Sequence, residues 1–537
     1  MSIVKTYKIT SIENGIVATF YEQTQGTYST AIGIDPDNSV DGGVSNPKKS
    51  GYITPVPYEK FSSSFSGKPQ AIITNPIDEK VYVVNSGGTI YSYSNTLGSE
   101  TTVGTVTGST NGGAIYYNNY IYVLGSGASA NDVSRYGPLS SSPSLTNGVW
   151  TGATLGSQTA LGSTVTIVPR QMSLPGHWAC VHGDGAMYFL DFGTANTPAT
   201  KGRGMVHKIK TTYGGAEGDT NDGSAYNVLD LPPGYFPTCI TSYGTDLVIS
   251  AIQGQSTVLN QGKSALFFWD TFSDTFYNKV DISDPLITSV FNNNNTLYIF
   301  AGNSVSGFRV LRYEGGKSVR GLFLFEDGMC PYPGAVDSFG DRLSFGSYTV
   351  YPEASASVWS IGSKDGRLPK VLHNTMRSSS VGANPMVTAI KYVNQASNIS
   401  PRVIIGWSDN SSDGLDKLGG SMNSLWRSLL IDVGHKFVVR KLTIPLSDVT
   451  NSAFSIVPAI YTDDLKGTIY TLPTINDTTF AGKRQIVYKN PKMNGTVEVT
   501  GNHNLLLELR YSGSSVVAVA PPIEIEVEIF TDEPTVA

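Results

Sequence analysis

Four aspartates, Asp184, Asp246, Asp337 and Asp341, are the residues in this sequence whose chemistry could be hydrolytic. Glycoside hydrolysis needs two carboxyl groups held at a set separation. All four lie at or near turns, where aspartate is common because its side chain hydrogen-bonds the backbone. The sequence has no Gly-x-Ser-x-Gly elbow, no His-Glu-x-x-His helix and no repeated Ser-x-Asp-x-Gly-x-Thr-Trp box. We therefore predict a protein without catalytic residues, and a glycosidase is the weakest of three hypotheses.

Histidines and acidic turns are the candidate metal ligands. His177, His182, Asp184 and His207 lie in one presumed sheet module. Zinc ligands must converge on one point. His177 and His182 are five residues apart across a presumed strand, so their side chains point to opposite faces. We predict no zinc site.

Two polar turns resemble calcium loops in part. Asp409–Gly414 has oxygen donors at alternate positions, but Gly420 occupies the place of the bidentate Glu. Asp219–Gly223 is a similar partial match. We predict no metal and no cofactor, and a calcium role for either loop stays an alternative.

Nucleotide and nucleic-acid binding are disfavoured. Gln261–Ser264 imitates the end of a phosphate-binding loop, but Thr257 stands where that loop needs Gly, and Leu266–Trp269 predicts a strand instead of a helix. The net charge is −6, and Lys and Arg are scattered. Nucleic-acid binding needs a basic stripe, so we predict none.

The composition predicts an all-β protein. Charged residues make up only 15%, while Gly (57) and Tyr (29) are abundant, which suits short strands joined by tight turns. Neither a signal-peptide apolar region nor an 18-residue apolar run is present. The three cysteines, Cys180, Cys239 and Cys330, are too few for a disulfide scaffold, and the first two lie in apolar strand patterns. We expect buried free thiols and assembly in a reducing cytoplasm.

A repeated unit predicts a β-propeller over residues 66–420. Each copy has an apolar strand, a polar turn, a second apolar strand that usually carries Tyr, and a third strand with an aromatic residue, as in Gln70–Tyr93. The copies lie about 40–66 residues apart, and a four-stranded blade needs about 40–50. Seven blades is the best count, with six or eight as alternatives. The predicted central positions are Tyr82, Tyr122, Tyr188, Val248, Tyr298, Leu343 and Ile404.

Residues outside the repeats form two further predicted units. Residues 421–537 have cleaner period-2 strands, such as Ile523–Ile529, and predict an antiparallel β-sandwich with one wet face. Residues 1–65 predict strands followed by an extended arm, rich in Gly, Pro and Asp, which would lie on another subunit or supply the strand that closes the propeller.

Aromatic residues and long loops could bind sugars. Most of Trp150, Trp178, Trp269, Trp359 and Trp407 are better explained as blade core, because large aromatics dominate interior packing. The loops 137–175 and 212–235 are rich in Gly, Ser, Thr and Tyr, which adapt well to polar ligands.

Two stretches resemble structural proteins of tailed bacteriophages. One runs from Gly33 through Gly51–Val56 to Phe61, and the other from Leu425–Gly434 through Pro458–Asp464 to Pro521–Glu526. The overall plan is similar to tail nozzle or tail-tip proteins that carry a β-propeller beside small β domains. This resemblance implies a virion subunit that forms a ring with copies of itself and with other tail proteins, and it implies no catalytic residue.

The favoured hypothesis is thus a non-enzymatic virion protein, assembled in the host cytoplasm. Its arm and sandwich would make subunit contacts, because unpaired strand edges can extend a neighbour's sheet. A host-surface carbohydrate-binding protein is the alternative. No membrane-spanning segment is expected.

Overall fold

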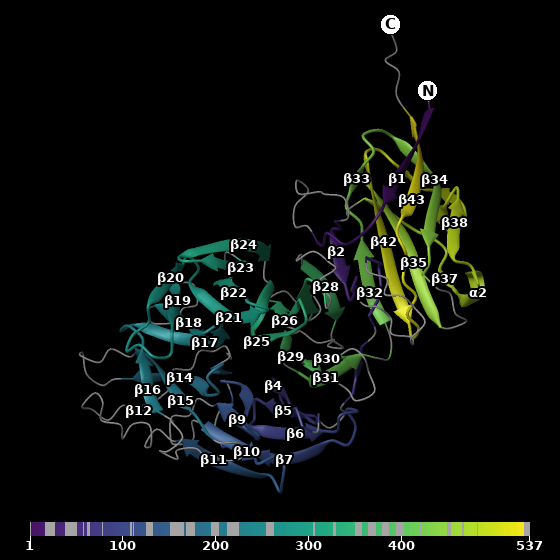
Figure 1. The fold of residues 1–537 in the computed structure, drawn as a ribbon. Helices are drawn as coiled ribbons and strands as arrows, with labels where there is room; N and C mark the ends of the chain where they lie inside the picture. The colour runs from purple at the N-terminus through teal and green to yellow at the C-terminus, as the bar shows by residue number, and fades with distance from the viewer. Residues whose placement is uncertain are drawn as a thin grey trace.

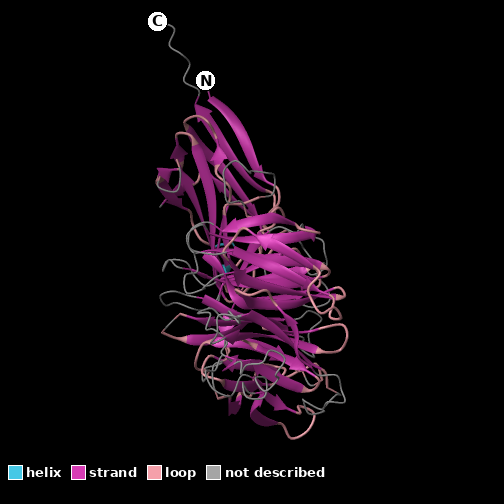
Figure 2. Ribbon diagram, turned by 90° about the vertical axis from the view of Figure 1, so that its left-hand side faces the viewer, coloured by secondary structure: helices cyan, strands magenta, loops and turns pink. Residues whose placement is uncertain are grey.

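The computed structural model is nearly all β, and within the described residues the one helix is the short α2 (Asp477–Phe480). A ring of sheets forms one part and a two-layered sandwich sits at one end of it (Figures 1 and 2). The structure describes residues 2–530 except 17–26, 38–50, 57, 62–64, 78, 108–109, 111, 125–132, 151–165, 168–177, 195–202, 212–224, 254–262, 304–306, 326–328, 350–356, 364–371, 378–385, 394–401, 410, 419, 421, 448–452, 464–466, 481 and 494.

The described residues of the ring form seven antiparallel blades, as the repeats predict. The first three contain β4 (Pro69–Thr74), β5 (Val81–Asn85), β6 (Thr89–Tyr93) and β7 (Thr101–Thr105); β8 (Ala114–Tyr117), β9 (Tyr120–Leu124), β10 (Val133–Gly137) and β11 (Ser144–Trp150); and β12 (Thr166–Ile167), β13 (Ala179–Val181), β14 (Met187–Thr194), β15 (Arg203–Ile209) and β16 (Ala225–Asp230).

The last four blades follow the same order. They contain β17 (Tyr235–Tyr243), β18 (Asp246–Gln253), β19 (Lys263–Trp269) and β20 (Asn278–Ile282); β21 (Leu286–Asn293), β22 (Thr296–Asn303), β23 (Gly307–Gly315) and β24 (Ser318–Phe325); β25 (Met329–Phe339), β26 (Arg342–Thr349), β27 (Ser357–Ile361) and β28 (Leu372–Arg377); and β29 (Met386–Val393), β30 (Arg402–Ser408) and β31 (Asp413–Leu418).

The ring is closed. The inner strands β4, β8, β13, β17, β21, β25 and β29 contact one another in that order, and β29 contacts β4 (Figure 1). Closure covers both faces of each sheet with neighbouring blades, which leaves only short outer edges. All seven predicted central positions are buried; six lie on the second strand of their blades, and Tyr188 lies on β14, which pairs with both β12 and β13.

The seventh blade takes its outer strand from the beginning of the chain. The strand β3 (Tyr58–Lys60) pairs with β31 in antiparallel register, with Tyr58 opposite Leu418. For β3, the structure thus agrees with the second alternative for the N-terminal segment, a strand that closes the propeller. Joining the first and last parts of a propeller in one sheet ties the ring shut through backbone hydrogen bonds.

The sandwich contains both ends of the chain. One layer has the order β1-β43-β34-β38 and the other β2-β32-β42-β35-β36. Its main strands are β1 (Ser2–Ile9), β2 (Thr30–Ile32), β32 (Met422–Arg427), β34 (Phe437–Pro445), β35 (Phe454–Thr462), β36 (Thr468–Thr471), β38 (Gln485–Lys489), β42 (Asn504–Gly513) and β43 (Ile523–Phe530); shorter ones are β33 (Ile431–Asp432), β37 (Ile475–Asn476), β39 (Lys492–Met493), β40 (Val497–Glu498) and β41 (Thr500–Gly501).

Residues 1–65 therefore join their own chain wherever they are described. Strand β1 pairs along its whole length with β43, from Ser2 opposite Phe530 to Ile9 opposite Ile523. Strand β2 pairs with β32. The isoleucines and valine of β43 point inward, as its alternation predicts, and its glutamates are only partly buried.

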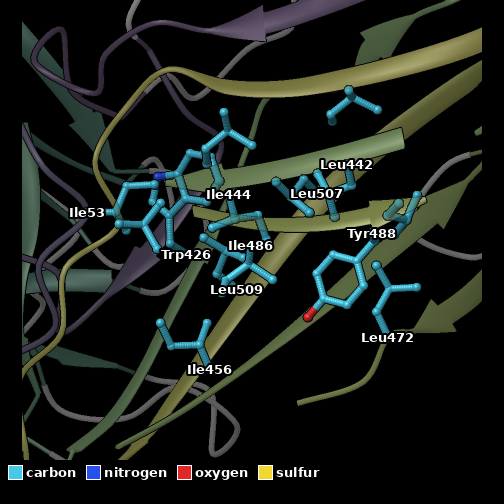
Figure 3. Close-up of a cluster of buried hydrophobic side chains, with 14 of the residues drawn as sticks. Ile53, Trp426, Leu442, Ile444, Ile456, Leu472, Ile486, Tyr488, Leu507 and Leu509 are labelled. Atoms are coloured by element: carbon cyan, nitrogen blue, oxygen red, sulfur yellow. The ribbon is translucent and has the colours of Figure 1, made fainter. Parts of the chain in front are cut away.

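The sandwich core is one continuous apolar cluster between the two layers. Trp426 and Leu507 from one layer and Leu442 from the other are completely buried in this cluster (Figure 3). Ile53, from the segment between β2 and β3, enters the same cluster. The core is therefore built from residues at both ends of the sequence.

Candidate functional site

One face of the ring gathers most of the predicted polar residues. Since all blades run in the same sense, the turns between their first and second strands lie on one face, which we call the turn face. It comprises the described residues of turns 75–80, 118–119, 182–186, 244–245, 294–295 and 340–341. The chemistry of this face depends on whether its acidic residues are free to react.

Asp184 is fully engaged. Its carboxylate accepts hydrogen bonds from the Tyr188 hydroxyl (2.8 Å) and the Ala186 backbone (3.0 Å), and Lys208 Nζ lies 3.0 Å away. Burial alone would raise the pKa of Asp184, but these donors outweigh burial and hold the pKa below its usual value. Asp184 is thus an ionised structural acceptor and is unsuited to act as a proton donor.

The other three candidate carboxylates each have a separate partner. Asp246 accepts a 2.6 Å hydrogen bond from the Tyr277 hydroxyl. Asp337 accepts from Lys391 Nζ and, at 2.8 Å, from the Tyr392 backbone on the seventh blade.

Asp341 lies on the same hairpin as Asp337, but its hydrogen-bond partner belongs to the fifth blade instead of the seventh. It accepts from Asn294 Nδ2 (2.7 Å) of the fifth blade. The carboxylates of this hairpin therefore hold neighbours on either side of the sixth blade. Each of the four predicted aspartates thus has its own hydrogen-bond partners, and none of these bonds joins one of them to another.

The described histidines belong to different environments. His182 shares a 2.9 Å hydrogen bond between Nδ1 and Ser242 Oγ of the fourth blade. His207 is buried, and its ring lies 4.9 Å from that of Phe189. His207 and Lys208 are adjacent on β15 and so point to opposite faces, which separates His207 from Asp184. His177 lies outside the described residues, and no cluster of potential metal ligands occurs among the described ones.

Neighbouring blades are connected across the turn face by side-chain hydrogen bonds, a feature absent from the sequence predictions. Tyr117 donates to the Gly185 carbonyl (2.8 Å), and Asn118 donates to the Thr211 carbonyl (2.6 Å). Asn292 donates to the Ser242 carbonyl (2.9 Å). With the bonds of His182, Asn294 and Asp337, these link every pair of consecutive blades from the second to the seventh. Side-chain hydrogen bonds therefore hold these blades together along the turn face.

Asp409 is held within its own turn, whereas Gln261 and Gly262 of the phosphate-loop imitation lie outside the described residues. Asp409 accepts from the backbone and hydroxyl groups of Ser411 and Ser412. Burial would raise the pKa of Asp409, but these bonds lower it to about 2. Ser264 is buried in strand β19 and donates to the Asp284 carbonyl, so a strand follows the Gly-Lys pair as predicted. Asp219–Gly223 lies outside the described residues.

The remaining predicted residues are mostly core. Trp178, Trp269, Trp359 and Trp407 are buried, whereas the Trp150 side chain lies outside the described part. All three cysteines are free; Cys239 and Cys330 are buried and Cys180 is partly exposed. Burial raises the pKa of Cys330 to about 11, so its thiol stays protonated. Within 137–175 the structure describes β11 and β12 beyond the end of β10, and within 212–235 it describes residues from 225 onward.

A buried ionic group joins the ring to the segment that leads from the sandwich. Arg342, 1% exposed, lies at the start of β26 with its Nη1 2.8 Å from Asp35 and 3.3 Å from Asp37. Its Nη2 donates to Ser360 Oγ (3.0 Å). Burial alone would lower the pKa of Arg342, but Asp35 and the other nearby groups raise it, so the charge persists.

Among the described residues, the most exposed large aromatic side chains lie on the hairpin between β19 and β20. Phe272 is 88% exposed and Tyr277 58%. The sequence predictions did not include either residue, because the surrounding Asp-Thr-Phe-Ser-Asp-Thr-Phe-Tyr run has no feature that distinguishes an exposed aromatic from a buried one.

No helix of the described part is long and apolar enough to cross a membrane. No protein-family model and no curated protein matches the sequence. Among solved structures, the extracellular domain of a hybrid two-component system from B. thetaiotaomicron is 9% identical over 85% of this chain and 59% of that one (TM-score 0.42).

Two propeller domains are similar over about two thirds of this chain. They are the Swd1 β-propeller domain of Myceliophteria thermophila (10% identity, 67% of this chain and 100% of that one, TM-score 0.38) and the Pan2 WD40 domain of Neurospora crassa (9%, 68% and 96%, TM-score 0.39). By its own strand pairing and closed ring, the chain is a seven-bladed β-propeller joined to a β-sandwich.

Proposed function

We propose that this protein is a non-enzymatic structural subunit of a bacteriophage tail, part of the nozzle or tip. In this proposal the sandwich makes contacts within the particle, and the propeller projects as a rigid module. The subunit would assemble with copies of itself and other tail proteins in the host cytoplasm and would then belong to the virion.

One observation carries the non-enzymatic part of the proposal. The aspartates that could have formed a hydrolytic pair are used instead to fasten blades or turns, as in the Asp337–Lys391 and Asp341–Asn294 bonds. Asp184, whose oxygens accept from several donors that lower its pKa, is a poor general acid, since those bonds favour its ionised form.

The open edge of the sandwich supports the assembly part. Strand β1 pairs with β43 on one side, and no described strand pairs with its other side. Ile3 and Val4 on this strand are 52% and 59% exposed. A long edge strand with exposed apolar side chains favours contact with another chain. The buried Arg342–Asp35 pair would hold the propeller to the segment next to this contact surface.

Assembly is tested on the full chain and on particles. Purified protein should form a defined oligomer by light scattering and native mass spectrometry, and the mass spectrum of purified phage particles should contain it. A protein that stays monomeric at all concentrations and is missing from particles would disprove the proposal.

The absence of hydrolysis is tested separately. Wild-type protein should release no reducing sugar from host surface polysaccharides, and Asp184→Asn, Asp246→Asn and Asp337→Asn should leave oligomer formation as it is. Release of sugar that one of these substitutions abolishes would replace the structural proposal with a glycosidase.

A further inference from the structure

The hairpin between β19 and β20 exposes a large aromatic side chain to solvent. Phe272 is the most exposed large apolar residue of the described part, at 88%. Burying such a side chain would remove a large apolar surface from water, and this position leaves that stabilisation unused. In Figure 1 the hairpin lies on the side of the ring away from the sandwich.

The turn that carries Phe272 is rigid. Asp270 accepts from the backbone nitrogens of Phe272 (3.0 Å) and Ser273 (2.8 Å), and the Ser273 hydroxyl donates to its other oxygen (2.6 Å). The indole of buried Trp269 donates to the Ser273 carbonyl (2.7 Å). The phenyl ring is therefore held in place by its own turn, and binding would order little further backbone.

Three tyrosines continue the aromatic surface. Tyr277 is 58% exposed and its hydroxyl is fixed by a 2.6 Å bond to Asp246. Half-buried Tyr313 lies 4.8 Å from Phe268 and 6.0 Å from Tyr243, measured between ring centroids. The side chain of Asn278, the residue after Tyr277, and the hydroxyl of Tyr313 share the Gly316 carbonyl, which places Tyr313 near Tyr277. We call Phe272, Tyr277, Tyr313 and Tyr243 the aromatic platform.

Polar groups surround the platform. Asp246 accepts from the Tyr277 hydroxyl, and Asp270 lies in the turn that carries Phe272. Asn278 donates to the Gly316 carbonyl (2.8 Å), and the Tyr313 hydroxyl donates to the same carbonyl (3.1 Å). The cores of protein–protein interfaces are depleted of charged residues, because desolvating carboxylates is costly. Carboxylates interspersed among rings therefore favour a ligand that brings its own hydroxyl or ammonium donors.

We propose that the aromatic platform binds the pyranose rings of a glycan composed of neutral or amino sugars. Such a ring has an apolar C–H face that can lie on Phe272 or Tyr277, and hydroxyl groups at its edge that can donate to Asp246 or Asp270. Amino groups gain a cation–π contact and a carboxylate partner. Acidic sugars are disfavoured by the same carboxylates. This binding does not depend on the role in the tail.

The test uses labelled full-length protein on an array of bacterial O-antigens, capsular polysaccharides and teichoic acids. Wild-type protein should bind a neutral or amino-sugar polymer, and Phe272→Ala and Tyr277→Ala should each weaken that binding by about tenfold or more. Tyr277→Phe should cause a smaller loss, because it keeps the ring. Thermal unfolding should be unchanged for Phe272→Ala, since its side chain packs against little.

Ile77→Ala is the matched control. Ile77 is 58% exposed on a turn of the first blade, and its backbone donates to Asn75 as that of Phe272 does to Asp270. The control should bind like wild type. No array signal from wild type, signal that survives both alanine substitutions, preference for acidic polymers, or an equal loss in Ile77→Ala would each overturn the proposal. Intact oligomers with altered glycan binding would separate this outcome from a failure of tail assembly.

Discussion

The propeller and the sandwich are assembled from the chain in opposite ways. Five blades are consecutive hairpins, in which each strand pairs with the next one along the sequence, and in the third blade β12 and β13 both pair with β14. In the sandwich the first strand pairs with the last, and β2 pairs with β32. The propeller thus forms mostly between strands that are close in sequence, and the sandwich forms between strands from the two ends of the chain. In the sequence, the propeller is an insertion between the two parts of the sandwich.

The largest expected loss of stability comes from removing one core side chain in each of the two parts. Trp426→Ala in the sandwich and Phe267→Ala in the propeller should each cost about 3–5 kcal/mol of unfolding free energy, because both side chains are completely buried. Hydrogen exchange should show lost protection in β34 and β42 for Trp426→Ala, and in the third and fourth blades for Phe267→Ala. Equal loss everywhere would mean that the two parts unfold as one unit.

The second prediction concerns the link between the parts. Arg342→Met should cost about 3 kcal/mol, because it leaves Asp35 buried without its ion-pair partner. Denaturant unfolding measures the loss, and Arg342→Met with Asp35→Asn should recover part of it. A single variant as stable as wild type would mean that the junction does not depend on this pair.

A third, smaller effect is expected from the strand contributed by the N-terminus. Deleting residues 2–9 removes the partly buried Tyr7 and Ile9 from the sandwich and should cost about 2 kcal/mol. The amides of β43 should lose protection while the blades keep theirs. Lost protection in the blades would contradict the separation of the two parts.

The smallest effect is a pH dependence that both parts share. The pKa of Asp409 in the seventh blade is about 2, below the unfolded value near 4, so its contribution is present above pH 4 and is lost as the pH falls through 2. Asp409→Asn should lower stability at pH 7 by about 1–2 kcal/mol and flatten this dependence.

A matched aspartate lies in the sandwich. Burial would raise the pKa of Asp463, but backbone hydrogen bonds from His503 and Asn502 lower it. Asp463→Asn should flatten the same acid limb, measured as urea midpoints between pH 2 and pH 5. An Asp409→Asn protein with the acid sensitivity of wild type would show that the Ser411 and Ser412 bonds do not hold in solution.

The comparison also explains what the sequence could predict. Blades were readable because hairpin partners lie close together, and a buried second strand such as that of Tyr122 or Tyr298 leaves a local apolar run. The pairing of β1 with β43 has no local signal, since many strands share the same alternation. Local sequence therefore could not distinguish an arm on another subunit from the strand that β3 adds to the seventh blade.

The candidate site, too, was predictable only where the signal was local in sequence. The aspartates were visible as residues, but their partners, such as Asn294 for Asp341, come from other blades and required the ring geometry. The exposure of Phe272 was invisible because Phe267 and Phe268, nearby in the same hairpin, are core. Periodicity distinguishes faces of a strand and carries no information on a turn.

The strand β3 has a consequence for synthesis. It leaves the ribosome early, but its partner β31 follows roughly 360 residues later, a delay of about 20–70 s at ordinary translation rates. During this time the nascent chain carries an unsatisfied strand while blade after blade is completed behind it. A chaperone that shields this segment, or a codon pattern that shortens the delay, should therefore raise the yield of correctly closed rings.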